Sequence, residues 1–163
     1  MSGLETRPEI RTWQPEDLDD ILEVEVCSFH TPWSRQAFEE ELFTNELACY
    51  LVLIYENRVV GYAGMWMILD EGHVTNVALH PEYRGRGWGA VLMEALMDAA
   101  RQRGASCMTL EVRPSNQVAL KMYESFGFIR KGVRSGYYSD TGEDALIMWR
   151  DDLLLPLRLE RGG

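Results

Sequence analysis

The sequence predicts an α/β protein with about seven strands and about four helices in 163 residues. From Ala48 to Leu79, short runs rich in β-branched and aromatic residues follow one another, which is typical of strands. From His73 to Asp98, an apolar run, a glycine-rich turn and a 3.6-residue apolar period succeed each other, which predicts a strand, a loop and a helix. The length and the 46% of hydrophobic residues suit one domain with a buried core, which we place at residues 9–150.

The N-terminal part is expected to hold one strand and two helices. A short strand near Ile10 to Trp13 follows a loose tail. Pro15 suits the first position of a helix that ends near Phe29. The apolar face expected for this helix is Leu18, Ile21, Leu22 and Val26. Ser34 can cap a second helix. The apolar residues of that second helix are Phe38, Leu42 and Phe43.

Six further strands and two further helices are expected in the rest of the chain. The strands are Ala48 to Tyr55, Arg58 to Leu69, Gly72 to Leu79, Cys107 to Val112, Phe128 to Arg134 and Ala145 to Trp149. Glu56-Asn57 suits a hairpin turn between the first two of these. The helix after the glycine-rich turn ends at Gly104, and Val118 to Phe126 form the last helix. The stripe expected on the former is Val91, Leu92, Ala95, Leu96 and Ala99.

The terminal segments, residues 1–8 and 151–163, are expected to be tails. Met1 to Glu9 lack the basic and apolar regions of a secretion signal, and no apolar run is long enough to span a bilayer. We therefore expect a cytoplasmic protein with no membrane partner.

Charge and cysteine content restrict the partners further. The chain has 26 acidic and 16 basic side chains and a net charge of −10, which disfavours direct nucleic-acid binding and favours a basic partner. Cys27, Cys49 and Cys107 are odd in number and form no CxxC pair, which argues against a disulfide framework or a zinc site. We expect them to be small buried hydrophobic residues. The oligomeric state stays open, with a monomer preferred.

Residues 84–90 form a glycine-rich loop directly before a helix. Without Cβ atoms, the unsatisfied N–H groups at the helix N-terminus can approach an anion closely, so a phosphate or pyrophosphate ligand is expected. A phosphate-binding P-loop would need Lys-Ser or Lys-Thr after the last glycine, but Ala90-Val91 stands there.

Two other interpretations of this loop remain. Gly85-x-Gly87-x-x-Ala90 has the spacing of a dinucleotide-binding fingerprint, with Glu111 at a suitable distance beyond it. However, that fingerprint turns straight from its strand into glycine, whereas five residues separate Leu79 from Gly85 here, and too little chain follows to complete such a fold. A purely structural turn is the second interpretation.

Two polar side chains near the next strand suggest proton-transfer chemistry. Glu111 ends this strand on the face opposite its core residues, and Tyr123 lies about two turns along the following helix. A strand followed at once by a helix folds back on itself, so both can converge on the cleft that receives the glycine loop. A carboxylate can accept a proton from an amine, and a phenol can donate one. Taken singly, each residue is better explained by a structural role, Glu111 as an exposed strand carboxylate and Tyr123 as a half-buried helix aromatic.

The segment Leu110–Phe128, LEVRPSNQVALKMYESFGF, resembles the GNAT N-acetyltransferases of the RimI type. The pattern Arg84-x-x-Gly87-x-Gly89 resembles their acetyl-coenzyme A pyrophosphate loop. Other matching features are Pro32-Trp33-Ser34, Asn76 to Pro81, Tyr137-Tyr138 and Gly142 to Met148. The resemblance covers Glu9 to Trp149, with departures at Gly85 and Trp88.

This resemblance implies a fold, a reaction and a set of residues. The fold is the GNAT fold, a single mixed, mostly antiparallel sheet of about six to seven strands flanked by about four helices. The reaction is acetylation of the N-terminal alanine of a small-subunit ribosomal protein by acetyl-coenzyme A, with Glu111 as proton acceptor, Tyr123 as proton donor and no metal. The expected cofactor-binding residues are Val77, Ala78, Leu79, Arg84, Gly85, Arg86, Gly87, Trp88, Gly89, Ala90 and Asn116. The expected peptide-binding residues are Trp33, Tyr137 and Tyr138.

Three other activities stay open at this point. The same machinery could acetylate a lysine or a small-molecule amine, although an α-amine is roughly 10–30% neutral near pH 7 and a lysine only on the order of 0.1%. A single ordinary carboxylate base therefore suits the α-amine better. A silent module that binds acetyl-coenzyme A or a protein is the third activity, and the presence of both Glu111 and Tyr123 speaks against it.

Overall fold

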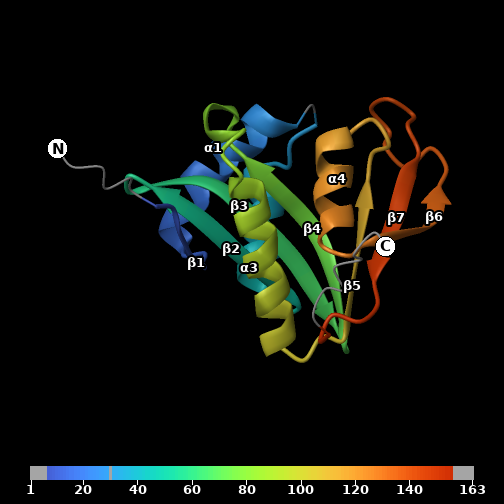
Figure 1. Ribbon diagram of the computed structural model, residues 1–163. Helices are drawn as coiled ribbons and strands as arrows, with labels where there is room; N and C mark the ends of the chain where they lie inside the picture. The colour runs from blue at the N-terminus through green and yellow to red at the C-terminus, as the bar shows by residue number, and fades with distance from the viewer. Residues whose placement is uncertain (1–6, 30, 156–163) are drawn as a thin grey trace. The chain divides into compact units, whose positions relative to one another are not determined.

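The computed structural model describes residues 7–29 and 31–155, which form the strands and helices labelled in Figure 1. The strands are β1 (Glu9–Thr12), β2 (Ala48–Tyr55), β3 (Arg58–Ile68), β4 (Glu71–Leu79), β5 (Cys107–Val112), β6 (Ile129–Arg134) and β7 (Ala145–Arg150). The helices are α1 (Leu18–Ser28), α2 (Arg35–Glu39), α3 (Trp88–Gln102) and α4 (Gln117–Ser125). Shorter helical turns cover Pro15–Asp17, Glu40–Thr44 and Pro81–Tyr83.

The seven strands form one sheet in the order β1-β2-β3-β4-β5-β7-β6. The β4–β5 pair is parallel, whereas β1–β2, β2–β3, β5–β7 and β6–β7 are antiparallel. The predicted fold class, a mixed and mostly antiparallel sheet flanked by about four helices, is confirmed. Within residues 7–29 and 31–155, no helix is long and apolar enough to cross a membrane. The expected tail residues 1–6 and 156–163 lie outside the described part of the chain.

The chain divides into two compact units. The first unit comprises the chain up to Trp66 together with Thr75–Asp98, and the second comprises Met67–Val74 and the chain from Ala99 onward. The first unit therefore holds β1, β2, most of β3, α1, α2 and the glycine loop, and the second holds β5, α4, β6 and β7.

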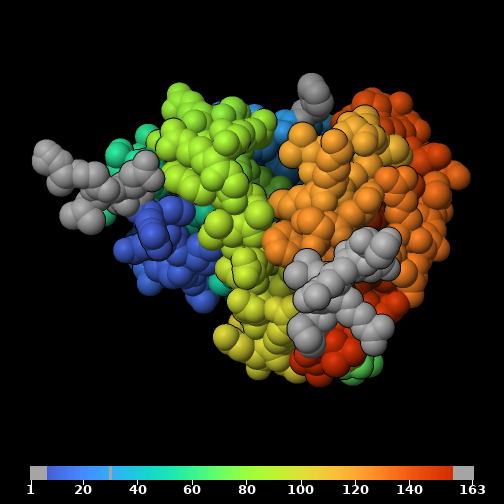
Figure 2. Space-filling view, in the orientation of Figure 1, coloured from blue at the N-terminus to red at the C-terminus, as the bar shows by residue number. Residues whose placement is uncertain are grey.

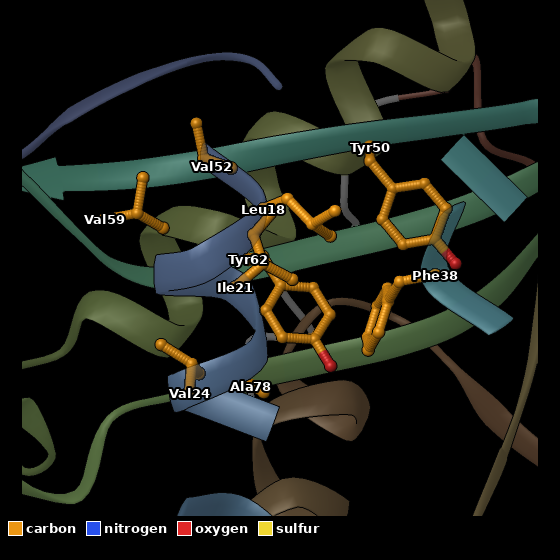
Figure 3. Packing of buried hydrophobic residues seen from close by; sticks show 9 residues of the cluster. All are labelled: Leu18, Ile21, Val24, Phe38, Tyr50, Val52, Val59, Tyr62 and Ala78. Carbon is orange, nitrogen blue, oxygen red and sulfur yellow. The ribbon is translucent and has the colours of Figure 1, made fainter. Parts of the chain in front are cut away.

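An aromatic and aliphatic cluster forms the core of the first unit. Figure 3 shows its valines at one end and the rings of Phe38, Tyr50 and Tyr62 together at the other. The Phe38 and Tyr62 rings meet edge to face, with centroids 5.9 Å apart. Tyr50 pairs across the sheet with Gly64, where a Cβ atom would lie 2.1 Å from the tyrosine ring. Gly64 therefore makes room for the buried Tyr50.

Two predicted apolar stripes are wrong in part, for a common reason. Val26 on α1 is 63% exposed, and the buried positions there include Val24 and Glu25. Val91 on α3 is 41% exposed. The buried residues of α3 are Leu92, Met93, Leu96, Met97 and Ala100. Spacings of three and four residues fit more than one helix face, and packing against the sheet selects one of them.

The cysteine prediction is correct only in part. Cys49 is buried, Cys107 is half-buried and Cys27 is exposed on α1, and none of the three forms a disulfide among the described residues. Cys27 follows Val26 on the exposed side of α1. Its predicted burial is therefore wrong for the same reason as that of Val26.

In the second unit, the beginning of β4 pairs in parallel with β5, and β7 lies between β5 and β6. β6 is an edge strand, and five of its six residues are exposed. α4 lies at the surface of the face seen in the space-filling view (Figure 2). Just after β7, the backbone N–H of Leu153 donates to the Ser106 carbonyl (3.0 Å), and the Leu153 side chain is fully buried.

Candidate active site

The predicted glycine loop adopts a conformation that requires glycine. Gly85 and Gly87 have φ angles of +80° and +79°, in the left-handed region that side chains disfavour. A Cβ atom at either position would meet nothing within 4 Å, so backbone conformation and not crowding sets the requirement. α3 begins directly afterwards, at Trp88. The loop therefore presents unobstructed backbone at the N-terminus of a 15-residue helix, an arrangement that suits an anion.

The two arginines of the loop have different surroundings. Arg84 donates from Nε to the Leu79 carbonyl (3.1 Å) and from its terminal nitrogen to Ser28 Oγ (3.3 Å), so it ties the loop to the end of β4. The Arg86 guanidinium lies 5.1–5.9 Å from the centres of three aromatic rings, contributed by Tyr55, Tyr83 and Trp88.

The aromatic support under Arg86 includes residues that sequence analysis missed. The rings of Tyr83 and Trp88 are stacked at 5.9 Å, and Tyr55 packs on Trp88 at 5.0 Å. Tyr55 comes from the hairpin between β2 and β3, so no local pattern connects it with the loop. Trp88, a departure from the family pattern, is part of this support.

Replacing Gly87 by alanine is expected to weaken acetyl-coenzyme A binding about fivefold to thirtyfold, because the left-handed conformation costs a side chain roughly 1–2 kcal/mol. A smaller fraction of the molecules would then have the loop in its binding conformation. The apparent dissociation constant would rise by the factor by which that fraction falls. Isothermal titration calorimetry measures this change. Gly104→Ala is the matched control, because Gly104 also has a positive φ (+90°) and open space but ends α3. Equal affinities of the two variants would contradict the assignment of the loop.

A buried carboxylate, Glu25, was not anticipated as part of this region. It is almost fully buried at the end of α1, where it accepts hydrogen bonds from the Tyr62 hydroxyl and from the backbone N–H of Trp33 (2.8 Å). Asn76 Nδ2 donates to the same Tyr62 oxygen (3.2 Å). Burial raises the pKa of Glu25, and its two hydrogen bonds partly oppose the rise. Glu25 thus links the loop before α2 to Tyr62 of β3, and Tyr62 in turn meets Asn76 of β4.

Glu25→Ala is expected to lower the free energy of unfolding by about 2–4 kcal/mol, because it leaves the Trp33 N–H and the Tyr62 hydroxyl without their acceptor. Urea denaturation measures the loss. The matched control on the same helix is Glu23→Ala, which removes an exposed ion pair with Arg58 (3.0 Å) and should cost at most about 1 kcal/mol. Equal losses in the two variants would show that the buried cluster adds no more stability than an exposed ion pair.

A second buried carboxylate organises the neighbouring part of the first unit. Glu41 Oε2 accepts from the Tyr50 hydroxyl (2.7 Å) and from the indole N–H of Trp66 (2.6 Å), and its Oε1 accepts from Asn45 (2.7 Å). The Tyr50 hydroxyl also meets Thr75 Oγ1 at 3.1 Å. Burial raises the pKa of Tyr50 far above its ordinary value, so this network holds a neutral phenol.

In the second unit, Glu111 lies where the sequence places it, at the end of β5, paired with Ile147 of β7. Its side chain is 26% exposed, and its Oε1 lies 3.2 Å from Arg134 Nε. The carboxylate also faces the Tyr137 hydroxyl and is the main cause of the raised pKa of that phenol. The Glu111 carboxylate is therefore partly accessible, so that an amine or one bridging water could come within hydrogen-bond reach of it.

Tyr123 is buried on α4 and stacks edge to face on Phe128, with ring centroids 5.9 Å apart. Burial, aided by Tyr138, raises the pKa of Tyr123 to about 12. The phenol is thus protonated near neutral pH, as a proton donor must be.

The aromatic residues expected to hold a peptide differ in exposure. Tyr137 is 48% exposed, Tyr138 is half-buried, and their rings meet edge to face at 5.0 Å. Trp33, in the first unit, packs against Phe38 of the core (5.2 Å) and is half-buried. Asn116 caps α4 by accepting from the Ala119 N–H (3.2 Å).

The predicted residues thus fall into two sets, each within one unit. The first unit holds the proposed cofactor segment, Val77 to Ala90, and Trp33. The second unit brings Glu111 beside Tyr137, and Tyr123 into electrostatic contact with Tyr138. Among residues 7–29 and 31–155, no group of three or more His, Cys, Asp or Glu side chains is arranged to hold a metal ion.

Comparison with known proteins gives consistent matches over most of the chain. Residues 18–128 match the Acetyltransferase (GNAT) family. A candidate ribosomal protein bS18-alanine N-acetyltransferase of Bacillus subtilis is 40% identical over 146 residues, which cover 90% of this chain and 97% of that protein. The ribosomal protein bS18-alanine N-acetyltransferase of Escherichia coli K12 is 34% identical over 143 residues, which cover 85% of this chain and 94% of that protein.

Comparison with solved structures also finds an N-acetyltransferase. The crystal structure of the ribosomal-protein-S18-alanine N-acetyltransferase from Escherichia coli superposes with a TM-score of 0.83 at 31% identity. The match covers 94% of this chain and 99% of that one.

Proposed function

The chain belongs to the GNAT acetyltransferase family, and on that premise we propose that it acetylates the N-terminal α-amine of a protein. The acetyl donor is acetyl-coenzyme A, and the acceptor is the N-terminal alanine of a small-subunit ribosomal protein. The observation that carries this proposal is the identity of 34–40%, over at least 85% of the chain, to relatives named for that reaction.

The first unit suits the cofactor. Acetyl-coenzyme A supplies an activated acetyl thioester and carries phosphates that need a site. The Arg84–Ala90 loop offers backbone N–H groups with open space at Gly85 and Gly87, and the positive charge of Arg86 lies over three aromatic rings of the same region. Backbone N–H groups near Val77 to Leu79 hold the acetyl carbonyl and stabilise the charge that develops on its oxygen.

The second unit supplies the proton transfers. The acceptor amine must be neutral to attack, so the Glu111 carboxylate removes its proton, directly or through one water molecule. Tyr123 donates a hydrogen bond to the sulfur as it leaves. Its pKa of about 12 exceeds that of a thiol, roughly 8.5, so the phenol stabilises the departing thiolate more than it protonates it.

In the second unit, Tyr137 and Tyr138 on the loop between β6 and β7 each offer an apolar face and a polar tip to a peptide backbone. Trp33 in the first unit offers the same chemistry. The net charge of −10 attracts a basic ribosomal protein, with an association rate that falls as salt rises.

The test is release of coenzyme A thiol in the presence of acetyl-coenzyme A and a basic peptide that begins with alanine. We expect release that depends on the peptide and an acetylated N-terminus by mass spectrometry. Binding of acetyl-coenzyme A without thiol release from any amine would identify the silent module instead. Release with spermidine or another small amine, but not with the peptide, would favour the small-molecule alternative.

A further inference from the structure

Arg113 joins two loops of the second unit. It follows β5 directly, two residues after Glu111, and its guanidinium reaches the β6–β7 loop, residues 135–144. One terminal nitrogen donates to both carboxylate oxygens of Asp140 (2.9 Å each), and the other donates to Thr141 Oγ1 (3.1 Å). This second nitrogen of Arg113 also lies 3.6 Å from Glu143 Oε1.

The same guanidinium also lies over the ring of Tyr138, one of the residues expected to bind the peptide. Its central carbon is 3.9 Å from the centre of the Tyr138 ring, the shortest cation–π distance among the described residues. Arg113 lowers the pKa of Asp140 and contributes to the lowered pKa of Glu143, so both carboxylates stay ionised and paired. Ser115 completes the connection, because its N–H and hydroxyl donate to Glu143 at 2.9 and 3.0 Å.

The β6–β7 loop has no buried residue to hold it in place. All ten of its residues are exposed or half-buried. Its internal hydrogen bonds join only residues of the loop itself: Tyr138 N–H to the Glu143 carbonyl (3.1 Å), Gly142 N–H to the Tyr138 carbonyl (2.7 Å), Gly136 N–H to Asp144 (2.8 Å), Thr141 N–H to Asp140 (2.9 Å) and Glu143 N–H to Thr141 Oγ1 (3.1 Å). Its position against β5 therefore depends on polar contacts, and most of these converge on Arg113 and Ser115.

We propose that Arg113 is a positioning residue for the acceptor peptide. It fixes Tyr138, and with it Tyr137, relative to the strand that carries Glu111, so that a peptide held by the tyrosines presents its amine to the carboxylate. This role rests on the proposed function. The role needs a guanidinium whose two terminal nitrogens reach separate side chains of the loop while its central carbon lies over the Tyr138 ring, and the single ammonium of lysine cannot reproduce that geometry.

The test compares Arg113→Met with Arg130→Met in steady-state kinetics on an alanine-initiated peptide. Arg130 is the matched control, because it forms an exposed ion pair with Glu124 (3.1 Å) in the same unit and contacts neither loop. We expect Arg113→Met to raise the peptide KM about tenfold or more, while the KM for acetyl-coenzyme A stays within about twofold. Arg130→Met should leave both constants unchanged.

A double-mutant cycle separates positioning from a general loss of structure. If Arg113 acts through Tyr138, adding Arg113→Met to Tyr138→Ala should raise the peptide KM little further. If Arg113→Met fails to fold, Asp140→Asn is a milder variant that keeps the arginine. It should also raise the peptide KM.

Three results would overturn the proposal: fully additive effects in the cycle, an equal rise of both KM values, or kinetics of Arg113→Met that match those of Arg130→Met. Failure of the proposed function gives a different result, because the wild-type protein itself would then acetylate no N-terminal peptide. The failure of the Arg113 proposal and that of the proposed function are therefore distinguishable.

Discussion

Glu111→Gln is expected to lower kcat about 100- to 1,000-fold at pH 7, because the amide cannot accept a proton from the attacking amine. The loss should shrink as pH rises, since a growing fraction of the α-amine deprotonates unaided. The pH–rate profile between about pH 6 and 9.5 measures both effects.

Glu124→Gln is the control for this experiment, because it removes an exposed carboxylate that pairs with Arg130 in the same unit. Its profile should match the wild type. If the Glu111→Gln and wild-type profiles run parallel at every pH, Glu111 has no part in the proton path.

Tyr123→Phe is expected to lower kcat about 10- to 100-fold with no rescue at high pH. Phenylalanine keeps the ring that packs on Phe128, so the fold and both KM values should change little. What is lost is the hydroxyl that assists the leaving sulfur. Because the pKa of Tyr123 is about 12, the phenol stays protonated across the assay range, and the wild-type profile should show no loss of activity from its ionisation.

A substrate with a better leaving group would test the same role independently. A thioester whose thiol has a lower pKa needs less assistance, so the difference between Tyr123→Phe and wild type should narrow with it. An unchanged kcat in a folded Tyr123→Phe protein, or a constant difference across leaving groups, would argue against Tyr123 as the donor.

Local sequence signals predicted the elements well because the interactions that define them are local. Glu56 and Asn57 form the expected hairpin turn, with φ angles of 51° and 63°. Ser34 caps α2 by accepting from the Ala37 N–H (3.1 Å), as its residue type suggests. Gly104 ends α3 in the left-handed conformation. In each case the partners lie within a few residues of one another.

The interactions that sequence analysis missed join distant parts of the chain. Glu25 meets Tyr62 across 37 positions, and Arg113 meets Asp140 across 27. A glutamate within an acidic helix looks like any solvated carboxylate until the packing of that helix is known, and for the same reason the helix faces containing Val26 and Val91 were misassigned. Roles for Glu111 and Tyr123 could be proposed from sequence because a family motif carries both.

The measurement that tests the central claim most directly is a comparison of two basic peptides with acetyl-coenzyme A. One begins with a free alanine and has its lysines blocked, and the other has a blocked N-terminus and one free lysine. We predict acetylation of the alanine peptide with a kcat/KM at least about 100-fold higher, because near pH 7 a far larger fraction of its amine is neutral. Faster acetylation of the lysine peptide would contradict an N-terminal acetyltransferase and establish a lysine acetyltransferase in its place.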